Sequence, residues 1–166
     1  MKKTLIATAV AGIASLPLFA IADEVPAAPY TFTGNVTLAS EYIYRGIEQT
    51  AGKPAIQGGF DFAHNSGFYA GIWGSNISWI SDGLPGTSAP IELDVYGGYK
   101  NTFAGGDWTY DLGVLSYVYP VSNLPSGTTK PDTTEVYGAI GWKWLTAKYS
   151  SVVSSHIFGF NSSTGG

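Results

Sequence analysis

The chain has 166 residues, with 8 Lys and Arg against 12 Asp and Glu, a formal net charge of −4 and no cysteine. This length suits one domain. The acidic balance argues against nucleic-acid binding, which requires clustered Lys and Arg, and the lack of cysteine excludes disulfides, zinc–thiolate sites and thiol catalysis.

Residues 1–22 have the pattern of a secretory signal peptide. Two lysines precede a mostly apolar stretch over 4–19, and an A-x-A cleavage site follows. We predict cleavage between Ala22 and Asp23 and export from the cytoplasm. The alternative is a membrane helix at the N-terminus, for which the apolar run is short.

The rest of the chain is predicted to be an extended lead-in over 23–30 and an all-β domain over 31–166. Seven segments alternate apolar and polar residues with a period of two, which is typical of strands whose two faces meet different surroundings. Several reach the roughly 9–11 residues that a tilted membrane strand needs. Their approximate ranges are 31–45, 54–64, 68–79, 91–101, 108–119, 135–145 and 147–158.

Short and long connections alternate between these segments. The short joints are expected at 65–67, 104–107 and 145–147, and the long ones at 46–53, 81–90 and 120–134. This asymmetry is typical of an antiparallel up-and-down outer-membrane β-barrel, with short periplasmic turns and longer external loops. No segment after the leader has the apolar length of a membrane helix, so a membrane-spanning chain would have to form a closed barrel.

Aromatic residues gather near the expected strand ends. Rings at both membrane interfaces form the girdles of outer-membrane barrels, although any β-rich protein collects aromatic residues. The residues expected in such girdles are Tyr42, Tyr44, Trp79, Trp108, Tyr110, Tyr117, Tyr119, Trp142 and Trp144.

The number of strands is odd, whereas bacterial single-chain outer-membrane barrels have an even number. The last residues, 160–166, have the composition of another loop. We therefore expect the barrel domain to be incomplete at its C-terminus.

Most charged residues of the expected strands fall on one face, which in a barrel would line the lumen because charge facing lipid is costly. A slight excess of carboxylates predicts a mildly cation-preferring lumen. A narrow barrel would instead be plugged by interior ion pairs. For Arg45 we expect an interior partner such as Asp61. The predicted lumen-facing charges are Glu41, Arg45, Asp61, Glu92, Asp94, Lys100, Asp111, Glu135, Lys143 and Lys148.

Four stretches carry a resemblance to a known family: Ser-Glu-Tyr-Ile-Tyr-Arg-Gly-Ile at 40–47, Pro-Ala-Ile-Gln-Gly-Gly-Phe-Asp at 54–61, Gly-Phe-Tyr-Ala-Gly-Ile-Trp-Gly-Ser-Asn at 67–76 and Glu-Leu-Asp-Val-Tyr-Gly-Gly-Tyr at 92–99. The chain resembles the TorF-type porin family of proteobacteria, which has a Gcw-type domain. The resemblance implies an outer-membrane β-barrel without a securely assigned substrate, and members longer than this chain.

Together these patterns predict an outer-membrane porin for passive transport of small solutes or ions, surrounded by outer-membrane lipid. We expect no enzymatic activity, cofactor or metal, and the oligomeric state stays open, a homo-oligomer included. A hydrolase built on His64 or His156 has no diagnostic spacing in its favour. The alternatives are a narrow plugged barrel with a structural or adhesive role, and a soluble periplasmic β-barrel that binds a ligand.

Overall fold

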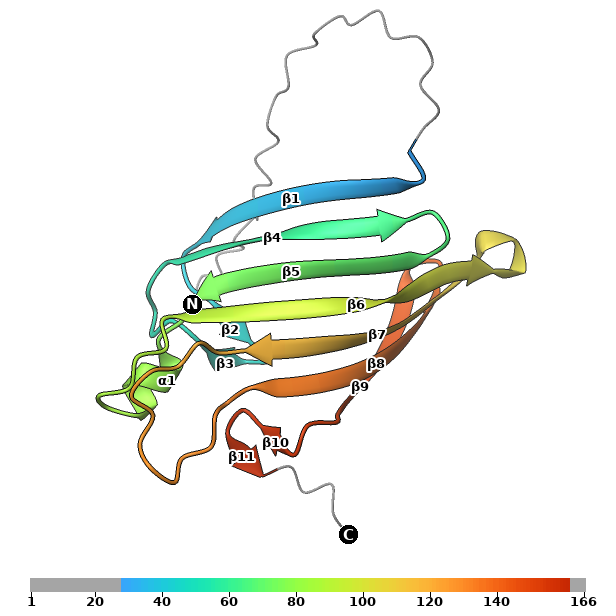
Figure 1. The fold of residues 1–166 in the computed structure, drawn as a ribbon. Helices are drawn as coiled ribbons and strands as arrows, with labels where there is room; N and C mark the ends of the chain where they lie inside the picture. The colour runs from blue at the N-terminus through green and yellow to red at the C-terminus, as the bar shows by residue number, and fades with distance from the viewer. Residues whose placement is uncertain (1–27, 162–166) are drawn as a thin grey trace, which may run out of the picture.

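The fold is a single curved antiparallel sheet. It is seen in a computed structural model that describes residues 28–161; the predicted signal peptide and most of the lead-in lie outside the described residues. Seven strands follow one another in the order β1-β4-β5-β6-β7-β8-β9, so every strand pairs with its neighbour along the chain (Figure 1). Within the described residues β1 and β9 do not pair, and the sheet is not closed.

The predicted all-β class and the seven main strands are confirmed. Their bounds are β1 Tyr30–Ala39, β4 Ala55–His64, β5 Phe68–Asn76, β6 Ile91–Phe103, β7 Trp108–Val118, β8 Thr133–Trp142 and β9 Leu145–Val152. Six smaller elements complete the order: β2 Ile43–Tyr44, β3 Ile47–Glu48, α1 Trp79–Gly83, the 3-10 turn η1 Ala104–Gly106, β10 His156–Ile157 and β11 Phe160–Asn161.

The alternation of short and long connections is also confirmed. The short turns β4–β5, β6–β7 and β8–β9 gather at one end of the sheet, on the right of Figure 1, and the long connections at the other. The last short turn differs from the prediction: it lies at Lys143 and Trp144, because Leu145 already pairs with Trp142. The long connections carry the β2–β3 hairpin and α1, and the β10–β11 hairpin follows β9; the strand pattern predicted none of these elements.

The first predicted strand, 31–45, is too long. β1 ends at Ala39, and the chain then reverses in the β2–β3 hairpin, where Tyr44 pairs with Ile47. Arg45 and Gly46 form the two-residue turn with φ values of 48° and 81°. Positive φ at both positions is the geometry of a type I′ turn, which favours glycine. The last predicted strand likewise ends early, at Val152, before the β10–β11 hairpin.

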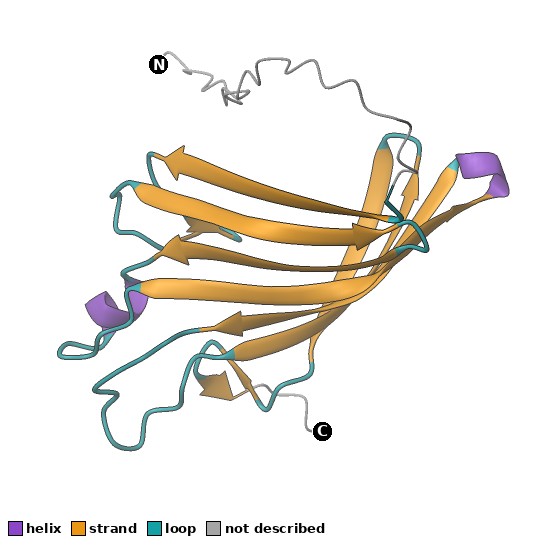
Figure 2. Ribbon diagram, turned by 45° about the horizontal axis from the view of Figure 1, so that its top comes forward, coloured by secondary structure: helices purple, strands orange, loops and turns teal. Residues whose placement is uncertain are grey.

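The two faces of the sheet have opposite character. Apolar side chains of every main strand lie on one face and are exposed, for example Leu38 at 82% and Phe60 at 56%. The other face carries polar side chains and includes Glu92 and Glu135, each only 2% exposed. The sheet curves around this polar face, and the small hairpins pack on it (Figure 2). We call these the convex and the concave face.

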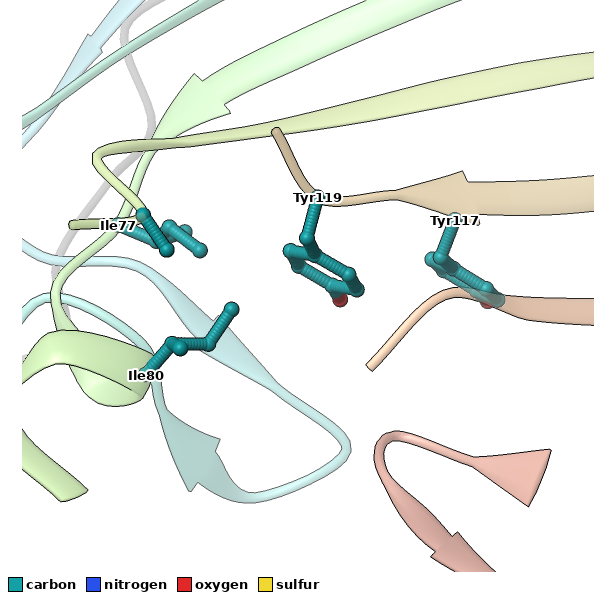
Figure 3. Close-up of a cluster of buried hydrophobic side chains, with 5 residues drawn as sticks. Ile77, Ile80, Tyr117 and Tyr119 are labelled. Atoms are coloured by element: carbon teal, nitrogen blue, oxygen red, sulfur yellow. The ribbon is translucent and has the colours of Figure 1, made fainter. Parts of the chain in front are cut away.

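The buried hydrophobic cluster lies at the loop end rather than along the sheet. Ile77, Ile80 and Ala89 from the β5–β6 connection pack with Tyr117 and Tyr119 at the end of β7 (Figure 3). Residues of both small hairpins and of α1 surround this cluster, namely Tyr42, Tyr44, Trp79 and Phe158. The long connections therefore fold inward over the concave face.

The aromatic residues expected in two girdles form a belt at one end of the sheet only. At the short-turn end, neighbouring rings on the convex face form a belt, with ring contacts joining Phe68, Tyr99, Tyr110, Phe103, Trp108 and Trp142. At the loop end the prediction is wrong, because Tyr42, Tyr44, Trp79, Tyr117 and Tyr119 belong to the inward-facing cluster. The hydroxyl groups of the four tyrosines find hydrogen-bond partners there, as buried tyrosines usually do. The buried Trp79 Nε1 has no such partner among the described residues.

Candidate functional site

Seven of the ten charged residues predicted to share a face do so. Strand register places them on the concave face: Asp61, Glu92, Asp94, Lys100, Asp111, Glu135 and Lys148. The other three do not lie on the main strands: Glu41 is in the connection after β1, and Arg45 and Lys143 are in turns. Carboxylates thus outnumber lysines by five to two on the concave face.

Tyrosines lie across glycines of the neighbouring strands to reach these carboxylates. Asp61, Gly71 and Tyr96 occupy one register row on β4, β5 and β6. The Tyr96 ring lies over Gly71, where a Cβ atom would come within 2.5 Å of it, and its hydroxyl donates to Asp61. Glycine at this position therefore makes room for a hydrogen bond that spans an intervening strand.

A second register row runs across β5, β6, β7 and β8, and here a tyrosine at each end of the row reaches over a glycine toward the middle. Tyr69 lies over Gly98 and Tyr137 over Gly113, and their hydroxyl groups meet between β6 and β7. The Tyr69 hydroxyl also donates to Asp111 at 2.5 Å. Gly98 and Gly113 thus leave room for tyrosine rings to cover the concave face.

The two concave-face lysines lie nearer the short-turn end and face aromatic rings. Lys148 Nζ lies 3.9 Å from the centre of the Tyr137 ring, and Lys100 Nζ lies 5.3 Å from that of Tyr69. Such contacts are stabilising cation–π interactions. The two lysines of the concave face therefore lie toward the short turns, while Glu92, Asp94 and Glu135 lie toward the loops.

The β2–β3 hairpin is anchored to the concave face by polar contacts. Arg45 Nη2 lies 2.8 Å from Glu135 Oε2 on β8, and the Tyr44 hydroxyl is 2.5 Å from that of Tyr117. The Arg45 side chain is 51% exposed and that of Glu135 only 3%. Arg45 pairs with a carboxylate, as expected, but its suggested partner Asp61 is wrong, because the hairpin carries Arg45 across to β8.

Glu92 is held by two tyrosines from outside the main strands. The hydroxyl groups of Tyr42 and Tyr119 each donate to its carboxylate at 2.9 Å. Burial raises the pKa of both tyrosines, and the negative charge of Glu92 raises it further. Both phenols therefore remain protonated donors at neutral pH.

Asp94 differs from the other concave-face carboxylates in its hydrogen bonding. Its Oδ1 atom is shielded from solvent and accepts no hydrogen bond among the described residues. It borders a cavity of about 440 Å³ between the sheet and the β2–β3 hairpin. The lining includes Trp73, which pairs with Asp94 across β5 and β6, and the exposed Glu41; further lining residues are Tyr42, Tyr44, Gln57 and Tyr117.

The strand pattern identified the carboxylates but not the tyrosines that hold them. Tyr42 and Tyr44 were instead expected in the aromatic girdles. The signal that could have found Tyr69, Tyr96 and Tyr137 is their register with glycine on the adjacent strand.

No helix among residues 28–161 has the length and apolar character to cross a membrane, and within the same residues no group of three or more His, Asp or Glu side chains could hold a metal ion.

Comparisons with known proteins give one family assignment. No curated protein and no solved structure matches the chain. A family model described as a bacterial protein of unknown function, Gcw_chp, matches residues 23–166. The chain therefore belongs to the Gcw_chp family.

Proposed function

We propose that this chain forms part of the wall of an outer-membrane β-barrel. The observation that carries the proposal is the inside-out arrangement of the sheet: apolar side chains on the exposed convex face and hydrogen-bonded charges on the covered concave face. Large contiguous apolar surfaces are unusual on soluble monomers. A lipid-facing apolar band and a polar interior are the pattern of transmembrane barrels.

The aromatic belt supports the same orientation. Its rings are confined to the convex face at the short-turn end, where a membrane interface would lie if the short turns faced the periplasm. In a membrane, the backbone groups along the outer edges of β1 and β9 would need further strands beside them, because an open sheet edge is not tolerated in lipid.

Passive passage of ions or small solutes follows as the activity, with the concave face as the lumen. Its five carboxylates and two lysines favour cations over anions. The β2–β3 hairpin adds Arg45 to this face, where it pairs with Glu135, and carboxylates still outnumber the positive charges there.

The second candidate is a narrow plugged barrel with a structural or adhesive role. The observation in its favour is the β2–β3 hairpin, which packs on the concave face and joins the buried cluster at the loop end. The loops would then present the functional surface, and the lumen would conduct poorly.

Two measurements separate these functions. The protein is expressed with its leader in a Gram-negative host, and its fractionation is followed with and without detergent. Planar-bilayer conductance is then recorded in a potassium chloride gradient. Membrane association with a cation-selective conductance is the expected result. Membrane association without conductance would favour the plugged barrel, and a protein soluble without detergent would refute both.

A further inference from the structure

We propose that the cavity beside Asp94 binds small organic cations that carry an N–H donor, such as primary ammonium groups. The inference rests on the proposed function in one respect, because it names the class of solute that the concave face would hold. Its evidence is the lining of this cavity, which lies at the loop end of that face.

The first observation is which carboxylates of the concave face already accept a hydrogen bond. Glu92 accepts from two tyrosines, Asp61 from Tyr96, and Glu135 from Arg45. Asp94 Oδ1 is shielded from solvent like a core atom and has no such donor within residues 28–161. A buried acceptor without a partner is costly, and native structures rarely keep one without a reason.

The second step is the distribution of positive charge. Arg45 is the cation of the β2–β3 hairpin that borders the cavity, and it is engaged by Glu135. Lys100 is six residues further along the same strand, about 20 Å at the usual rise, and lies over the Tyr69 ring. Both cations therefore have other partners, and Asp94 forms no ion pair within residues 28–161.

The third step is the aromatic lining. Trp73 and Tyr117 flank Asp94 in one register row on β5 and β7, and the Tyr42 ring meets the Trp73 ring edge-on at 5.6 Å. Aromatic faces attract cations, most strongly when water is excluded. Exposed Glu41 adds a second negative charge to the cavity lining.

These features together select the ligand. An ammonium group in the cavity would pair with the Asp94 carboxylate while its alkyl part contacts the rings. An anion would meet two carboxylates, and a neutral alcohol would gain neither the charge attraction nor the cation–π contact. A quaternary ammonium would contact the rings but could not donate to Asp94.

The test is calorimetric titration of the detergent-solubilised protein with n-butylammonium chloride at pH 9, where carboxyl groups are ionised and the alkylammonium group still carries its charge. We expect saturable binding, at least tenfold weaker for Asp94→Asn, and none for n-butanol. The matched control is Asp61→Asn, which alters a concave-face carboxylate outside the cavity and should change the affinity less than twofold. Heat-modifiable migration in gel electrophoresis verifies that both variants are folded.

Three outcomes would overturn the proposal: no binding to the parent protein, equal affinity in Asp94→Asn, or equal affinity for tetramethylammonium. Failure of the amine-binding proposal can be distinguished from failure of the proposed function. A cation-selective conductance without amine binding would refute the Asp94 site alone. A protein that is soluble without detergent would refute the barrel, and the same titration could then be made in buffer.

Discussion

Substitution of Gly71 by alanine tests whether the tyrosine rows hold the sheet together. A Cβ atom at position 71 would lie 2.5 Å from two ring carbons and the hydroxyl oxygen of Tyr96. Carbon atoms pack at roughly 3.5–4 Å, so the ring would have to retreat by about 1 Å. That movement breaks the hydrogen bond to Asp61. A hydrogen bond to a charged group contributes about 1.5–3 kcal/mol, and we expect the free energy of unfolding to fall by about 2 kcal/mol.

The assay is equilibrium unfolding of the micelle-bound protein in urea. A matched control is Gly138→Ala on the convex face, where the new Cβ would meet only the flexible end of Leu112 at 3.3 Å, with an expected change below about 0.5 kcal/mol. In a Tyr96→Ala background the cost of Gly71→Ala should fall to a similar level. Equal stability of Gly71→Ala and Gly138→Ala would refute the reasoning.

Three further predictions concern the hairpin and the convex face. Arg45→Ala leaves the buried Glu135 without its cation and should lower the free energy of unfolding by about 1.5–3 kcal/mol; an unchanged urea midpoint would contradict this. Gly46→Ala forces alanine to a φ of 81° and should cost about 1 kcal/mol, again measured by urea unfolding. Ile72→Lys places a charge at mid-strand on the convex face and should cost about 2–4 kcal/mol in a membrane. Thr33→Lys on the concave face of β1 is its control, and equal recovery of both variants in the membrane fraction would refute the lipid-facing assignment.

Period-two patterning predicted most of the fold because each main strand separates two environments. It placed Ile91, Leu93 and Val95 on one face and Glu92 and Asp94 on the other, as the structure does. Where a strand is apolar on both faces the pattern is ambiguous, as over 68–79. There the structure turns Phe68 and Ile72 outward and Trp73 inward.

The site was harder to predict because tertiary contacts define it. Tyr42 and Tyr44 continue the alternation of β1, and only the Arg-Gly turn signals that the chain reverses. The partner of Arg45 is 90 residues away in sequence, a distance at which local pattern carries no information. The cavity beside Asp94 exists only because that hairpin covers the sheet.

The in-folded hairpin also has a consequence for the order of folding. Every strand pair of the main sheet joins neighbours along the chain and can therefore form early, since short loops close at low entropic cost. Arg45 and Tyr44 find their partners only after β8 and Phe158 are in place. We expect docking of the hairpin to be a late step, so that its substitutions accelerate unfolding and leave the refolding rate almost unchanged.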